Sequence, residues 1–243
     1  MKKYLFVIGD VHGEYDLFTS LVKEYDKACH QLVLIGDLID RGSRSKECLL
    51  LAKDLVENNQ AVCLKGNHED IFLRFLKDPE GRFDNYILNG GGETIESLLH
   101  SGAVLEYSPT EISLMIQSRY KELLMFLENL PYFYEWENFL CVHAGVNLSL
   151  SDWTKTSHRD FLWIRKEFHE EKNKTNRKII FGHTPTRYLY QDMIKTSLWL
   201  SDNKIGIDGG AVYGGSLHGV IFNKETIIQD IELKNSQEWK PAF

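Results

Sequence analysis

The sequence lacks the cysteine pattern of a disulfide-stapled or zinc-clamped protein. Only four of its 243 residues are cysteine (Cys29, Cys48, Cys63 and Cys141), and no two of them form a Cys-x-x-Cys pair. Cys63 and Cys141 lie inside short apolar runs that are typical of buried strands. We therefore expect each cysteine to be reduced and to pack as a small apolar side chain, rather than to act as a metal ligand or nucleophile.

Long hydrophobic runs and an excess of basic charge are also missing. No stretch is long enough to cross a bilayer, and the apolar residues after Lys2-Lys3 meet Asp10 too soon for a signal peptide. The formal net charge is −7, and the basic residues between positions 165 and 178 are mixed with glutamates. These features predict a cytoplasmic protein that binds neither membranes nor nucleic acid.

The composition that is present suits one large α/β domain. With 43% apolar and 12% aromatic residues, a chain of 243 residues can bury a substantial core. We find no internal repeat, no low-complexity segment and no linker that would separate a second domain. We therefore expect residues 1–243 to form a single domain, and the sequence leaves its oligomeric state open.

Five short apolar runs each end in a glycine-flanked aspartate, asparagine or histidine. The runs are Tyr4–Ile8 before GDVHG (9–13), Leu32–Ile35 before GDLIDRG (36–42), Ala61–Lys65 before GNHE (66–69), Phe139–Val142 before HAG (143–145), and Ile179–Phe181 before GHTP (182–185). Buried strands of an open α/β sheet deliver polar groups at their carboxyl ends, where ligands bind. The five motifs therefore predict one shared site.

The spacing of apolar residues predicts helices between these strands. The expected helices are Glu14–Tyr25 and Ser43–Asn58, then a helix-only block from about 70 to 130 with Asp70–Lys77, Glu93–His100 and Glu111–Asn129 around a loop at 89–92. This block could cap the strand ends. Further strands are expected at Tyr132–Tyr134, Lys204–Asp208, Leu217–Phe222 and Thr226–Leu233.

The polar residues of the motifs suit two metal ions. The candidate ligands are Asp10, His12, Asp37, Asn67, His143 and His183. Carboxylate, amide and imidazole donors without thiolate favour manganese, iron or zinc. Asp37, at the end of the central strand, is the best placed to bridge two ions. Such a pair would activate a water and stabilise the oxygens of a phosphoryl transfer.

In this order, the five motifs resemble the signature blocks of the metallophosphoesterases, and more narrowly of the PPP-type serine/threonine phosphatases, a group related to the diadenosine tetraphosphate hydrolases. The resemblance covers about residues 9–215. It implies a calcineurin-like domain: a four-layer αββα sandwich of two mixed sheets flanked by helices, with the block at about 70–130 as a helical insertion. Near the end, GIDGGAVYGG (206–215) replaces the Ser-Ala-Pro-Asn-Tyr block of the eukaryotic branch and resembles the bacterial branch.

The resemblance also implies roles for individual residues. Asp10, His12 and Asp37 would hold one ion, and Asp37, Asn67, His143 and His183 would hold the other. The expected metal for both is Mn²⁺, with iron or zinc as alternatives. His68 would protonate the leaving oxygen, with Asp40 orienting its ring, and a metal-bridging hydroxide would be the nucleophile. Arg41 and Arg165 would bind phosphate oxygens, with Asn67 and Tyr213 also contacting substrate. Glu69 and Asp208 would support the site.

Several functions use such a centre. The leading interpretation is a phosphatase acting on phosphoserine and phosphothreonine of proteins, with a phosphorylated protein or a small phosphoester as its partner. The alternative is hydrolysis of dinucleoside polyphosphates. A third interpretation is a binding scaffold without turnover, which the complete ligand set disfavours. A fourth is a nuclease or phosphodiesterase, which the Asp40-Arg41 pair disfavours. Trp163 and Trp199 are interpreted as core residues.

Overall fold

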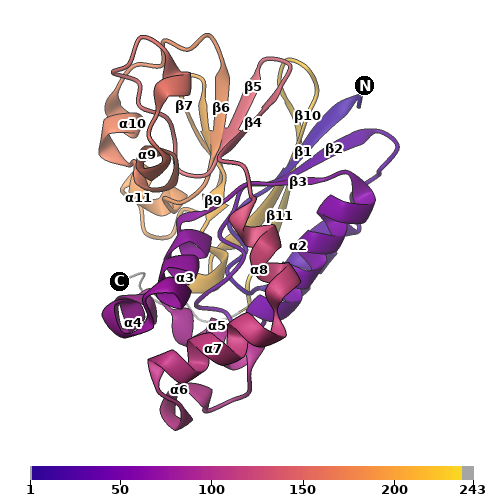
Figure 1. Cartoon of the computed structure of the whole chain (residues 1–243). Coiled ribbons are helices and arrows are strands. Elements are labelled where there is room, and N and C mark those ends of the chain that lie inside the picture. Colours follow the sequence, from indigo (N-terminus) through magenta and orange to yellow (C-terminus); the bar gives the residue numbers. More distant parts are fainter. Residues whose placement is uncertain (1, 237–243) are drawn as a thin grey trace.

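The computed structural model describes residues 2–236, which form two mixed sheets (Figure 1). The first sheet has the order β11-β10-β1-β2-β3, with β9 beside β10, and the second has the order β4-β5-β6-β8-β7. The strands are β1 (Tyr4–Ile8), β2 (His30–Leu34), β3 (Val62–Cys63), β4 (Phe133–Trp136), β5 (Phe139–Val142), β6 (Lys178–Phe181), β7 (Trp199–Ser201), β8 (Lys204–Gly206), β9 (Asp208–Gly209), β10 (Ser216–Phe222) and β11 (Ile227–Lys234).

Helices flank both sheets. They are α1 (Tyr15–Val22), α2 (Ser45–Asn59), α3 (Asn67–Lys77), α4 (Pro79–Leu88), α5 (Gly91–Leu98), α6 (Ala103–Glu106), α7 (Pro109–Arg119), α8 (Lys121–Glu128), α9 (His158–Trp163), α10 (Lys166–Glu170) and α11 (Thr186–Tyr190). Figure 1 shows α9, α10 and α11 beside the second sheet, whereas α3 to α8 gather at the opposite end of the molecule. The predicted α/β fold with two mixed sheets is confirmed.

The period-two alternation of side chains along the strands builds the layers. On β1, Leu5 and Val7 pack in a cluster between the two sheets, together with Phe139 of β5. Phe6 and Ile8 point the other way, into the larger cluster formed with the helices of the first sheet. Because all these strand residues are buried on both faces, the strands read as continuous apolar runs in the sequence.

The predicted long helix Glu111–Asn129 is wrong: the chain forms α7 and α8 with a break at Tyr120. This residue leaves the helical region, with φ −123° and ψ 33°. Its hydroxyl donates a 2.6 Å hydrogen bond to the carbonyl of Leu98 in α5. A tertiary contact thus overrides an uninterrupted helical pattern, which local periodicity cannot reveal.

Two further differences concern the same block. Helix α4 was not predicted, although Asp78 accepts a hydrogen bond from Gly81 N as N-cap and Pro79 opens the helix. The expected loop at 89–92 is also shorter, because Gly91 and Gly92 begin α5. Gly90 alone has a left-handed backbone, with φ +89°, and a Cβ there would lie 2.6 Å from Cγ of Arg41. The glycine therefore lets α5 start directly beside the Arg41 loop.

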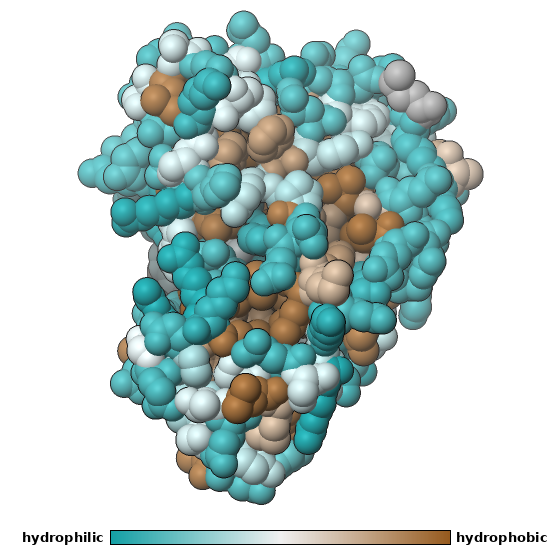
Figure 2. Space-filling view, in the orientation of Figure 1, coloured by the Kyte–Doolittle hydropathy of each residue, from teal (hydrophilic) through white to brown (hydrophobic). Residues whose placement is uncertain are grey.

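The predicted strand Lys204–Asp208 is divided between the sheets. β8 pairs with β6 in the second sheet, and after Ile207 the chain continues as β9 beside β10 of the first. Figure 2 shows a face on which polar side chains dominate and apolar ones gather in patches between them. None of the helices within residues 2–236 combines the length and apolar composition needed to cross a membrane.

Candidate metal centre

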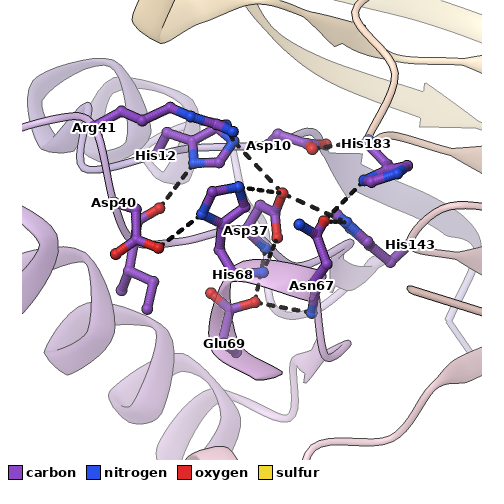
Figure 3. A network of polar contacts seen from close by, with 12 residues as sticks. Asp10, His12, Asp37, Asp40, Arg41, Asn67, His68, Glu69, His143 and His183 are labelled. Carbon is purple, nitrogen blue, oxygen red and sulfur yellow. Dashed lines mark hydrogen bonds and ion pairs between the residues drawn. The ribbon is translucent and has the colours of Figure 1, made fainter. Parts of the chain in front are cut away.

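The polar residues of the five motifs meet at the carboxyl ends of the strands (Figure 3). Asp10 follows β1, Asp37 follows β2, Asn67 opens α3 after β3, and His143 and His183 follow β5 and β6. All six predicted ligands, His12 included, are at most 6% exposed. The two sheets thus contribute donors to one buried cluster, as the common strand polarity predicts.

Asp37 lies at the middle of this cluster. Its Oδ2 is 3.5 Å from Nε2 of His12 and 3.5 Å from Nε2 of His143. Within residues 2–236, two groups of potential ligand atoms can be recognised, His12–Asp37–His68 and Asp37–His143–His183, each with its atoms within 4.8 Å of one another. Asp37 is the residue common to both groups.

The imidazole rings present unprotonated nitrogens to this centre. Nδ1 of His143 faces the carbonyl of Ile35 at 2.9 Å and therefore carries the proton, which leaves a lone pair on Nε2. That nitrogen faces Oδ1 of Asn67 at 2.8 Å, so two acceptors point at each other. Burial lowers the pKa of His143 to about 4, which keeps the ring neutral. Acceptors converging in this way fit a shared cation.

The remaining ligands complete the same arrangement. Nδ1 of His183 lies 2.8 Å from Oδ1 of Asn67, and its backbone N–H donates to Oδ2 of Asp10 at 2.8 Å. Among the described residues, the buried Oδ1 of Asp10 has no hydrogen-bond partner. Nδ1 of His12 faces the carbonyl of Ile39 at 2.8 Å, so its Nε2 is an acceptor as well.

Electrostatics favours cations at this position. Burial raises the pKa of Asp37 to about 7, and burial followed by the charges of Asp208 and Asp37 raises the pKa of Asp10 well above its usual range. Clustered buried carboxylates are unfavourable unless positive charge compensates them. The donor set therefore fits the two divalent ions predicted from the sequence.

Glu69 holds the Asp37 loop in place. Its carboxylate accepts hydrogen bonds from the backbone N–H groups of Gly66, Asp37 and Leu38 at 2.8–2.9 Å. Gly36, with φ +97°, passes so close to Gly66 that a Cβ would lie 2.5 Å from its nitrogen. The backbone is thereby fixed where Asp37 itself has a left-handed φ of +51°.

His68 forms a buried pair with Asp40 beside the cluster. Its Nδ1 is 2.7 Å from Oδ2 of Asp40, and its Nε2 is 4.0 Å from Oδ2 of Asp37. Burial lowers the pKa of His68. Because Nδ1 is committed to Asp40, Nε2 is the nitrogen that faces the site. The structure thus brings the predicted acid and its predicted orienting residue into direct contact.

Two residues that were not predicted from the sequence hold Asp40. Oδ1 of Asp40 accepts hydrogen bonds from the hydroxyl of Tyr86 in α4 at 2.8 Å and of Thr94 in α5 at 2.6 Å. Tyr86 and Thr94 are fully buried. A polar residue at position 94 on the buried stripe with Gly91, Ile95 and Leu98 was a signal in the sequence; Tyr86 offered none.

The predicted phosphate-binding residues border the cluster from two sides. Nη1 of Arg41 donates to Nε2 of His12 at 2.6 Å, and its guanidinium lies 5.3 Å from the ring centre of Tyr213. Nη1 of Arg165 donates to Oγ1 of Thr184, the neighbour of His183, at 2.9 Å. Asp208 is buried, and its Oδ1 accepts from the backbone N–H of Gly210.

The interpretation of Trp163 as a core residue is wrong. Its side chain is 37% exposed, and its ring lies edge-on to that of His183 with the centroids 5.8 Å apart. Trp163 ends α9 two residues before Arg165, so both side chains project at the rim of the site. Trp199 is half-buried and packs against the core of the second sheet, with its ring centre 6.0 Å from that of Phe181.

Comparison with known proteins points to one family. Residues 4–218 match the calcineurin-like phosphoesterase family. A bis(5'-nucleosyl)-tetraphosphatase PrpE [asymmetrical] of Anoxybacillus flavithermus is 28% identical over 87% of each chain, and serine/threonine-protein phosphatase 1 of Salmonella typhimurium is 25% identical over 88% of this chain and 90% of that one. The crystal structure of a putative diadenosine tetraphosphatase, 19% identical, has a TM-score of 0.66 and covers 97% of this chain and 95% of that chain.

Proposed function

Because the chain belongs to the calcineurin-like phosphoesterase family, we propose that its metal centre hydrolyses dinucleoside polyphosphates, with diadenosine tetraphosphate as the test substrate. The single observation that carries a phosphoryl-transfer function is the position of Asp37. Its Oδ2 lies at 3.5 Å from imidazole nitrogens on both sides, which suits a carboxylate shared by two ions.

The ligands are assigned as their positions suggest. Asp10, His12 and Asp37 would hold one ion, and Asp37, Asn67, His143 and His183 the other, with Mn²⁺ as the proposed metal and iron or zinc as alternatives. When bound, the two ions would supply an activated water and neutralise charge on the phosphoryl group.

The other residues act on the substrate directly. Arg41 and Arg165 would bind phosphate oxygens through their planar guanidinium groups. To donate a proton from Nε2 to the leaving oxygen, His68 must react as the imidazolium, a form that the Asp40 carboxylate beside Nδ1 favours while it keeps the ring oriented. In this assignment the proton comes from Nε2, the ring nitrogen that faces the metal ligands. The role as acid thus accounts for the position of His68 beside them.

The named relatives support one order of the two candidate substrates. Sequence motifs alone place phosphoproteins first, but several relatives that align with about nine-tenths of the chain are named as bis(5'-nucleosyl)-tetraphosphatases. This similarity supports the dinucleotide. Phosphoserine and phosphothreonine of proteins remain the second candidate, because the Salmonella phosphatase aligns over a comparable length.

A direct comparison of substrates tests the proposal. The Mn²⁺-loaded protein is expected to hydrolyse diadenosine tetraphosphate with a kcat/KM at least about tenfold higher than that for a phosphoserine peptide. The word asymmetrical in the relatives' name supports cleavage into unequal products, which for diadenosine tetraphosphate would be AMP and ATP. A higher kcat/KM on the peptide would reverse the order, and turnover of neither substrate would favour a binding scaffold.

A further inference from the structure

A cavity of about 610 Å³ opens beside Arg41. Its walls come from the start of α1, from the loop 41–44, from the junction of α4 and α5, and from the turn that carries Tyr213. Arg41 lines this cavity and also contacts His12 of the metal centre. A group bound in the cavity would therefore lie beside a phosphate held at the centre.

The cavity has an apolar side and an acidic side. Ile87, Leu88 and the half-buried ring of Tyr213 line the first, and Leu88 is 79% exposed although it is apolar. Asp16 and Glu93 line the second. The one other cation on the described walls, Arg44, is already paired with Asp16 at 2.7 Å and with Glu47 at 3.1 Å.

The residues that line the cavity favour some functional groups of a ligand over others. Carboxylates repel further phosphate groups, but they accept hydrogen bonds from hydroxyl and amino groups. An aromatic and aliphatic wall suits a flat apolar ring. A nucleoside combines such a ring with a ribose diol, and a volume of about 610 Å³ is within the range of small-molecule sites.

We propose, resting on the proposed function, that this cavity binds the nucleoside adjoining the phosphate under attack. Glu93 accepts hydrogen bonds from the nucleoside, and Leu88 and Tyr213 pack against its base. Within the described residues, no ion pair engages Glu93, so its carboxylate is available to a ligand.

Matched variants test the cavity. Glu93→Gln and Leu88→Ser are expected to lower the ratio of kcat/KM on diadenosine tetraphosphate to kcat/KM on p-nitrophenyl phosphate by about three- to tenfold. Glu96→Gln on the same helix and Leu105→Ser, whose side chain is 93% exposed on α6, lie outside the cavity walls and serve as controls. Their ratios should equal that of the unmodified protein.

A second measurement separates this inference from the proposed function. Adenosine should inhibit hydrolysis of p-nitrophenyl phosphate, and its inhibition constant should rise in Glu93→Gln. If the dinucleotide is hydrolysed but neither the ratio nor the inhibition constant changes, the cavity is assigned wrongly and the function stands. If the dinucleotide is not hydrolysed and the adenosine effect remains, the function fails and the cavity stands. If Glu93→Gln and Leu88→Ser lowered kcat/KM only for a lysine-flanked phosphopeptide, the cavity would be a peptide site and the proposal would be overturned.

Discussion

Asp37 is the residue on which the geometry of the site depends. It is the member common to both groups of potential ligands, and Glu69 fixes its backbone. The GD pairs with their flanking glycines could be recognised in the sequence because each ligand directly follows a buried strand. Tyr86 and Thr94 could not be assigned in that way, since the bonds to Asp40 span 46 and 54 residues of sequence.

Asp37→Asn is expected to release both ions, because the shared negative charge is removed from each site at once. The measurement is metal content per chain by elemental analysis after loading with Mn²⁺ and gel filtration. Asp40→Asn is the matched control: it changes a buried aspartate of the same motif that contacts His68 instead of the ligands, so two ions should remain. Two ions retained by Asp37→Asn would contradict the shared-ligand assignment.

His68→Asn should impair proton donation without removing metal. The expected loss in kcat is about 10²–10⁴-fold for a poor leaving group such as an alkyl phosphate, and much smaller for p-nitrophenyl phosphate, whose leaving oxygen needs no proton. Kinetics across esters of graded leaving-group pKa, with metal content checked, would show this. An equal loss for all esters would reject the role of His68 as acid.

At the scale of elements, the helices after β3 do more than cover the strand ends. α3 begins with Asn67 and His68, α4 and α5 supply the two hydroxyls on Asp40, and the carbonyl of Gly90 accepts from the backbone N–H of Arg41 at 3.0 Å. The sequence predicted helices here but not their boundaries, because α4 and the break at Tyr120 depend on contacts between helices. We propose that these helices position the His68–Asp40 pair.

Tyr86→Phe tests that proposal. Removing the hydroxyl leaves Oδ1 of Asp40 with one bond fewer, so kcat on poor leaving groups should fall several-fold while KM stays the same, and stability should fall by about 1 kcal/mol. Tyr120→Phe removes another hydrogen bond of a tyrosine hydroxyl, which is part-buried and goes to the carbonyl of Leu98, away from the pair. It should cost similar stability and leave kcat unchanged; equal kinetic effects in both variants would indicate a purely structural role for Tyr86.

The pairing of β10 and β11 contains a pH-dependent contact. Burial alone would lower the pKa of His218, but Nδ1 faces Asp230 at 2.8 Å and Nε2 faces the carbonyl of Thr196 at 2.7 Å, and together these acceptors raise it. A raised folded-state pKa adds stability that is present below the unfolded value of about 6.5 and is lost as pH rises through the folded value.

His218→Gln should therefore reduce the free energy of unfolding more at about pH 5.5 than at about pH 9. Urea denaturation of both proteins at the two pH values measures the difference, and Asp230→Asn should reproduce it because the imidazolium loses its charged partner. A larger destabilisation by His218→Gln at the higher pH would have the wrong sign for this contact.

At the scale of the whole molecule, the two sheets bring together side chains that are up to 173 residues apart in the sequence, as in the contact between Asp10 and His183. The strands that carry the site residues could be anticipated because each apolar run ends in a motif, but the order of the strands in each sheet could not. The crossing between sheets at Ile207 could not be anticipated either, since this single residue separates β8 from β9 and the pairing partner of each strand lies elsewhere in the sequence.

Anomalous diffraction from a crystal of the Mn²⁺-loaded protein tests the central claim most directly. We expect two peaks about 3.5–4 Å apart, with Oδ2 of Asp37 between them. His12 and Asp10 should contact one peak, and Asn67, His143 and His183 the other. A single peak, or a second peak that Asp37 does not contact, would contradict the dinuclear centre.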